Sequence, residues 1–79
     1  MGIEQMRVAE GSEFASTSLK QMQIRRDLGV IVLAIRRAGG EMLFNPPAEA
    51  VIEGGDYLIV MGEQESLRKL EQRLSEDRG

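Results

Sequence analysis

The chain of 79 residues contains no cysteine and no histidine. Without cysteine it can form no disulfide and offers no thiolate ligand to a metal, and nothing points to an oxidising compartment. The absence of both residue types also removes the commonest general base and the strongest side-chain nucleophile of enzyme active sites. No serine lies in the Gly-x-Ser-x-Gly sequence of a nucleophile elbow. We therefore expect no catalytic residues and no enzymatic activity.

Aromatic residues and excess positive charge are also scarce. Phe14, Phe44 and Tyr57 are the only aromatic residues, and 13 acidic residues outnumber 10 basic ones, which gives a net charge of -3. Proteins that bind nucleic acid usually combine a basic surface with aromatic rings that stack on bases. Nucleic acid is therefore not an expected partner.

Long apolar segments are missing as well. The longest apolar run, Val30–Ile35, is far shorter than the roughly 20 residues that a membrane-spanning helix needs. The N-terminus lacks the basic and then apolar pattern of a signal peptide. We expect a chain that does not insert into a membrane and that lies in the cytoplasm.

The residues that are present predict a small folded domain. Hydrophobic residues make up 42% of the chain and charged residues 29%, which is typical of globular proteins. A chain of this length buries only a thin core. We expect residues 1–79 to form one domain.

Periodicity and turn signals predict six elements. The sequence favours strands over Ile3–Val8, Val30–Ile35, Met42–Phe44 and Tyr57–Met61, a helix from about Thr17 to Leu28 that breaks near Ile24, and a helix over Glu63–Glu76. Ser18 and Gln21 have the spacing of a capping box, and Gly29 is suited to end the first helix. Leu67, Leu70 and Leu74 lie on one face of the second helix, and Glu65 and Lys69 have the spacing to pair across one turn of it.

The order strand, helix, strand, strand, strand, helix predicts an α+β fold. We expect a small mixed sheet of about four strands with both helices on one face. The runs Val30–Ile35 and Tyr57–Met61 are apolar on both faces of their strands, and two short helices can cover only one. A second copy of the chain is the simplest cover for the other face, so we expect a homodimer.

Three segments together resemble the TrkA-C domain, also called RCK-C. They read "EGSEFASTSLKQM", "LGVIVLAIRR" and "NPPAEAVIEGGDYLIVMGEQESLRKL", and the resemblance extends from about residue 6 to residue 74. It implies a dimeric, cytoplasmic regulatory domain of a potassium channel or potassium uptake transporter, acting on a membrane pore or transporter subunit. The alternatives are a regulatory domain of another ion or solute transporter and a purely structural dimerisation domain.

In the family the domain usually follows an RCK-N lobe with a nucleotide-binding Rossmann fold. This sequence contains no Gly-x-Gly-x-x-Gly run after a predicted strand, so we do not expect this chain to bind NAD or ATP as a cofactor.

The resemblance also implies a candidate ligand, because several family members bind cyclic di-AMP between two copies of the domain. The positions to which it points are Ile31, Leu33, Arg37, Phe44, Asn45 and Pro46. Arginine is suited to contact phosphate, and Asn45 offers an amide to a base edge. The structural alternative is that the isoleucine and leucine are core residues, Arg37 a solvated strand end, and Asn45–Pro47 only a turn.

The acidic residues Glu10, Glu13, Glu53 and Asp56 offer carboxylate oxygens of the kind that calcium prefers. Their spacing is not that of an EF-hand loop, and Glu53-Gly54-Gly55-Asp56 is typical of a tight turn. We therefore expect no metal site. Loss of the Asp56 side chain should cost about 1 kcal/mol through loss of the turn.

Overall fold

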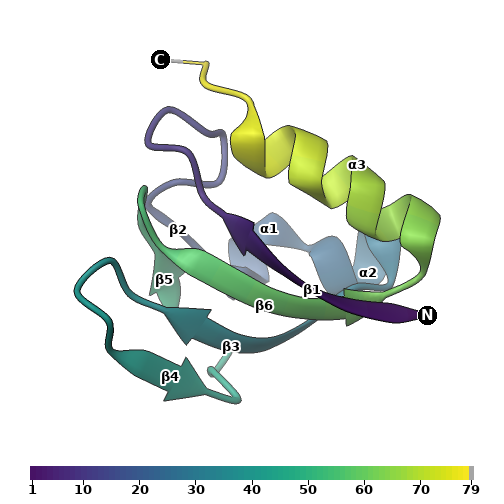
Figure 1. The fold of residues 1–79 in the computed structure, drawn as a ribbon, viewed down its shortest axis with the longest axis horizontal. Coiled ribbons are helices and arrows are strands. Elements are labelled where there is room, and N and C mark those ends of the chain that lie inside the picture. The colour runs from purple at the N-terminus through teal and green to yellow at the C-terminus, as the bar shows by residue number, and fades with distance from the viewer. Residues whose placement is uncertain (79) are drawn as a thin grey trace.

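The computed structural model describes residues 1–78, which form a four-stranded sheet with helices packed against it (Figure 1). The strand order is β1-β6-β3-β4, with bounds Gly2–Arg7 for β1, Ile31–Arg36 for β3, Met42–Phe44 for β4 and Tyr57–Gly62 for β6. A second, two-stranded sheet pairs β2 (Thr17–Ser18) with β5 (Val51–Ile52). The helices are α1 (Leu19–Met22), α2 (Ile24–Leu28) and α3 (Gln64–Ser75).

The hydrophobic core lies between α3 and one face of the sheet. Leu67, Leu70 and Leu74 are fully buried on α3 and share one cluster with Leu58 and Val60 of β6. Burial alternates strictly along β6, as expected of a strand with one face in the core. Each of the three buried leucines contributes about 1.5 to 3 kcal/mol of transfer free energy, which fixes α3 on the sheet.

The opposite face of the sheet, here called the open face, is mainly apolar. Strand register places its side chains in cross-strand rows. The rows are Ile3, Met61 and Ile31; Gln5, Ile59, Ala34 and Phe44; and Arg7, Tyr57, Arg36 and Met42. Ile3 is 63% exposed and Phe44 72% exposed, whereas the helices within residues 1–78 pack into the core on the other side.

The α+β class and the local signals at the first helix are confirmed. Ser18 and Gln21 form the capping box. Gln23 takes a left-handed conformation with φ 55° and divides the helical segment into α1 and α2. Gly29 ends α2 with φ 70°, a conformation that glycine adopts without steric cost.

One expectation about the sheet and one about α3 were wrong, and a second, smaller sheet was not predicted. All strand pairs are antiparallel, so the sheet is not mixed. The β2–β5 sheet was not predicted because strands of two residues carry no periodic signal. On α3, Glu65 pairs with Arg68 and not with Lys69, because residues three apart are also neighbours on a helix.

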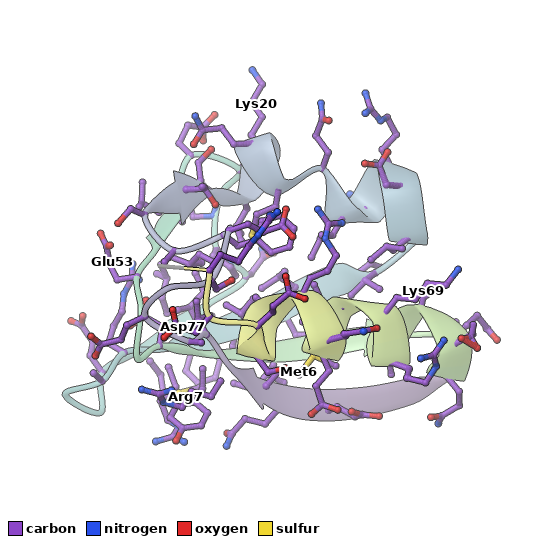
Figure 2. All side chains as sticks on the ribbon, turned by 90° about the horizontal axis from the view of Figure 1, so that it is seen from above. Met6, Arg7, Lys20, Glu53, Lys69 and Asp77 are labelled. Carbon is purple, nitrogen blue, oxygen red and sulfur yellow. The ribbon has the colours of Figure 1, made fainter. Side chains whose placement is uncertain are left out.

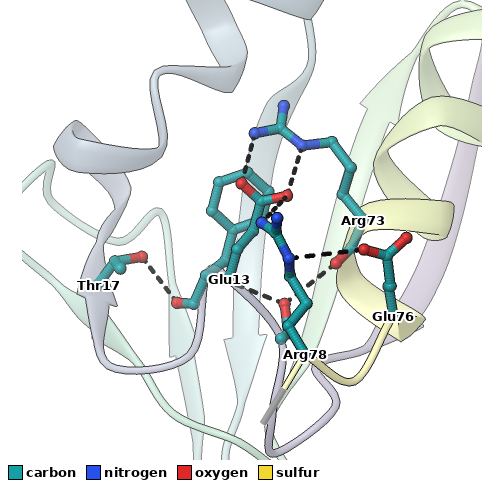
Figure 3. A network of polar contacts seen from close by, with 7 residues as sticks. Glu13, Thr17, Arg73, Glu76 and Arg78 are labelled. Carbon is teal, nitrogen blue, oxygen red and sulfur yellow. Dashed lines mark hydrogen bonds and ion pairs between the residues drawn. The ribbon is translucent and has the colours of Figure 1, made fainter.

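The C-terminal end of α3 is fastened to the loop that follows β1 (Figure 3). Arg73 donates hydrogen bonds of 3.0 and 2.8 Å to the two carboxylate oxygens of Glu13, and its guanidinium lies 4.5 Å from the centre of the Phe14 ring. The Ser12 hydroxyl donates to the Arg73 carbonyl at 3.1 Å, and the Arg78 amide donates to the Gly11 carbonyl at 2.7 Å. This loop therefore closes one end of the core.

The ion pair between Glu13 and Arg73 should make stability depend on pH. The hydrogen bond from Arg73 lowers the pKa of Glu13 from 4.5, so the pair stabilises the fold fully above that pH and progressively less as the pH falls through the lowered pKa. Because the Arg73 side chain is 42% exposed, solvent screens the pair, and Glu13→Gln should cost about 0.5 to 1 kcal/mol at neutral pH.

Urea unfolding of the parent and Glu13→Gln between neutral and acidic pH measures this effect. The difference between the two should shrink as the pH falls below 4.5. Glu71→Gln is the control, since its carboxylate forms no ion pair with the residues that the structure describes. A pH-independent difference would contradict the assignment.

Candidate functional site

A cavity of about 500 Å³ opens between the α1–α2 segment and the first half of β3. It exists because β4 is short: β4 pairs only with Ala34–Arg36, and among residues 1–78 no strand lies beside Ile31 on that edge. Asn45 ends the ladder in a left-handed conformation with φ 47° and donates its backbone N–H to the Leu33 carbonyl at 2.9 Å. Pro46, which has no N–H, cannot extend the ladder.

The cavity combines an apolar interior with a cationic border. Its lining residues are Leu19, Lys20, Gln23, Ile24, Arg25, Arg26, Val30, Ile31, Val32, Asn45, Pro46 and Ala48. Ile24 and Val30 are buried and belong to the core, whereas Lys20, Arg25 and Arg26 are exposed. No carboxylate is among the lining residues. Such a site suits a ligand with a flat apolar part and negative charge.

The structure separates the six residues to which the resemblance points into two groups. Ile31, Asn45 and Pro46 all line the cavity. Leu33 and Phe44 lie close to it in sequence but are not lining residues, and Phe44 is on the open face. Ile31 belongs to both surfaces, because its side chain is in the open-face row with Met61.

Arg37 lies outside the cavity lining and makes contacts elsewhere in the chain. One of its guanidinium nitrogens donates to Asp56 Oδ2 at 2.7 Å and to the Val51 carbonyl at 2.9 Å. Asp56 is only 3% exposed, and its Oδ2 also accepts the Glu53 backbone N–H at 2.8 Å. The predicted turn is therefore present and is reinforced by an ion pair that the sequence did not predict.

The neighbouring Arg36 points in a different direction, as strand alternation predicts. Its guanidinium lies 4.3 Å from the centre of the Tyr57 ring, in the same row of the open face. Only one of the two consecutive arginines therefore reaches Asp56.

The turn that holds Asp56 depends on close packing as well as on hydrogen bonds. Gly55 has φ +92°, a conformation that other residues rarely adopt. At Gly54 an added Cβ would lie 2.5 Å from the Glu10 Cα, so only glycine fits. Within residues 1–78 no group of three acidic, histidine or cysteine side chains is placed to hold a metal ion, and no helix there has the length and hydrophobicity to cross a bilayer.

Lys20, Arg25 and Arg26 were not predicted as site residues. They precede the apolar strand, and nothing in their spacing predicts that they share a cavity with Asn45. Their only signal is local: Gln23 breaks the helix, which turns Arg25 and Arg26 toward the start of β3.

Comparison with known proteins identifies related sequences over most of the chain. The model of the TrkA-C domain family matches residues 3–75. The chain is 35% identical over 68 residues to the K(+)/H(+) antiporter subunit KhtT of Bacillus subtilis, covering 86% of this chain and 41% of that protein. It is 38% identical over 64 residues to the probable potassium channel protein 2 of Methanocaldococcus jannaschii, covering 81% and 18%. The chain thus spans less than half the length of these relatives.

Solved structures share the fold. The RCK C domain of the potassium transport protein KtrA, in complex with cyclic diadenosine monophosphate, superposes with a TM-score of 0.81 at 30% identity, covering 90% of this chain and 80% of that one. The RCK_C domain dimer of S. agalactiae BusR in complex with c-di-AMP gives a TM-score of 0.82 at 22% identity, covering 94% and 90%. At that identity the second likeness concerns the fold alone.

The ion pair of Asp56 yields a test of stability. Asp56→Leu should cost about 2 to 4 kcal/mol, because it leaves Arg37 and the Glu53 N–H without their partner, and this exceeds the cost expected from the turn alone. Asp56→Asn keeps an acceptor for Glu53 and removes only the charge, so it should cost less. Chemical unfolding of the three proteins measures the difference, and an Asp56→Asn variant as stable as the parent would show that the ion pair contributes nothing.

Proposed function

The chain belongs to the TrkA-C domain family, and from this membership we propose that it is a ligand-sensing, dimer-forming regulatory domain of a potassium channel or potassium transport system. The observation that carries the proposal is the family match over residues 3–75, together with relatives that include an antiporter subunit and a potassium channel protein. The proposed domain comprises residues 1–79, lies in the cytoplasm and catalyses no reaction. In a full-length protein it would act beside an RCK-N lobe and a pore or transporter subunit.

Two copies of the chain are proposed to associate through the open face. This face presents Ile3, Met61, Ile31, Ile59 and, on the edge strand β4, the exposed Phe44. Monomeric proteins seldom leave such an apolar surface in water. An isologous pairing would cover the same patch on both copies. The dimeric state of the BusR domain is consistent with such an arrangement.

The cavity beside β3 is the proposed ligand site, and cyclic di-AMP is the proposed ligand. Support comes from the complex of the KtrA domain with this nucleotide and from the lining by Ile31, Asn45 and Pro46. Leu33 and Phe44 are proposed to contact the ligand from the dimer side of the same hairpin. Arg37 could join them only by leaving Asp56.

Ligand binding is proposed to alter how the two copies meet. Ile31 borders the cavity and also lies on the open face, so a ligand that moves β3 changes both surfaces. A ligand shifts an equilibrium between two arrangements by its difference in affinity for them, and the rest of the protein would transmit that shift to the membrane component. A purely structural dimerisation domain is the alternative, and it would show association without saturable binding.

Dimer formation is tested by sedimentation equilibrium at micromolar concentration. The parent chain should have the mass of a dimer, and Ile3→Asp should shift it toward the monomer because it buries a charge at the interface. Val51→Asp is the control, since Val51 is similarly apolar and 40% exposed but lies in β5, outside the open face. A parent chain that remains monomeric would refute the dimer.

Ligand binding is tested by isothermal titration with cyclic di-AMP. Saturable heat is expected for the parent, and Asn45→Ala should weaken binding about three- to tenfold, the effect of losing one neutral hydrogen bond. Pro47→Ala is the neighbouring control, because Pro47 does not line the cavity. An absence of heat together with a stable dimer would favour the structural alternative.

A further inference from the structure

A phosphate group in the cavity needs a cation, and Arg37 is already engaged. Its guanidinium is held by Asp56 and by the Val51 carbonyl at 2.7 and 2.9 Å. Moving it away would leave the Asp56 carboxylate, which is 3% exposed, without its ion pair, and an unpaired buried charge is strongly destabilising. A ligand would have to compensate for that loss before it gained anything from Arg37.

The border of the cavity supplies other cations from the α1–α2 segment. Arg26 is engaged, since it donates to Asp27 at 3.0 Å and to the Gln23 side chain at 2.7 Å. The side chains of Lys20 and Arg25 make no ion pair or hydrogen bond to the residues that the structure describes. Figure 2 shows Lys20 extending outward from α1, away from the body of the domain. Both cations are therefore available to a ligand without breaking any contact.

The local charge of the cavity is opposite to that of the whole chain. The chain carries a net charge of -3, but the cavity lining includes three cations and no carboxylate. Arg25 shares the cavity lining with apolar residues, among them Ile24 of its own helix and Ile31 of β3. A guanidinium beside an apolar surface is weakly hydrated and suited to bidentate contact with phosphate oxygens.

We propose that Arg25, assisted by Lys20, binds the phosphate groups of an anionic nucleotide in this cavity, and that Arg37 serves the fold instead. This inference rests on the proposed function, because it assigns roles within the same site. The base of the nucleotide lies against Ile31 and Pro46, with the Asn45 amide at its edge. The ligand class is a nucleotide with phosphodiester or terminal phosphate groups, and a neutral nucleoside lacks the group that Arg25 recognises.

Calorimetric titration of cyclic di-AMP into matched variants tests the assignment. Arg25→Gln should raise Kd about ten- to hundredfold, as expected for a lost charge-assisted hydrogen bond, and Lys20→Gln a few-fold. Lys69→Gln makes the same change of charge on α3, at a residue that does not line the cavity, and should leave Kd unchanged. Arg25→Lys should recover part of the affinity. Arg37→Gln should lower the melting temperature but change Kd less than Arg25→Gln does.

The outcomes separate this inference from the proposed function. If cyclic di-AMP binds and Arg25→Gln binds it as tightly as Lys69→Gln, the phosphate assignment is wrong while the ligand site stands. If the parent does not bind cyclic di-AMP, the proposed ligand is wrong. Titration with inorganic pyrophosphate at low ionic strength then tests whether the cavity binds an anion at all. Amide NMR shifts centred on Arg25 and Asn45 would then support it, and shifts elsewhere or none would overturn it.

Discussion

A chain of this length has enough helix to cover one face of its sheet, and the other features of the domain follow from that constraint. The three leucines of α3 fill the core against β1 and β6, and the α1–α2 segment adds Met22 and Ile24 at one side. The inner strands β3 and β6 nevertheless carry apolar side chains on both faces. Since apolar area removed from water contributes about 25 cal/mol per Å², covering the open face would add stabilisation that residues 1–78 do not supply by themselves.

The ion pair between Arg37 and Asp56 stabilises a part of the domain that lies away from the leucines of α3. It joins the end of β3 to the turn before β6 and, through the Val51 carbonyl, to β5. The ion pair between Arg73 and Glu13 similarly connects α3 to the loop that follows β1. Both arrangements connect segments that are distant in sequence by charged side chains where there is too little apolar surface to connect them. As a consequence, Arg37 and Arg73 cannot contact a ligand without breaking an ion pair that stabilises the fold.

Local sequence signals predicted most of the fold, because they depend on residues close together in the chain. The capping box at Ser18, the left-handed Gly29 and the leucine face of α3 all follow from spacing alone. The open face also followed from the apolar runs. The ion pairs between distant residues did not follow from the sequence. Asp56 and Arg37 are 19 residues apart, and no periodicity connects them. The lining of the cavity was predicted only in part. Asn45 and Pro46, on the hairpin side, were named from the sequence. Its cations, Lys20, Arg25 and Arg26, lie in or beside the two short helices that meet at Gln23 and were not.

The early end of β4 connects these two parts of the molecule. If the strand continued past Phe44, it would pair with the first half of β3 and fill the space in which the cavity lies. Asn45 and Pro46 stop it, which leaves Ile31 with one side toward the cavity and its side chain on the open face. A nucleotide bound as proposed above would restore part of the missing wall and stiffen β3. Because β3 also contributes Ile31 to the open face, stiffening it would change the surface offered to a second copy. In this proposal, a local loss of sheet pairing is enough to couple ligand occupancy to association.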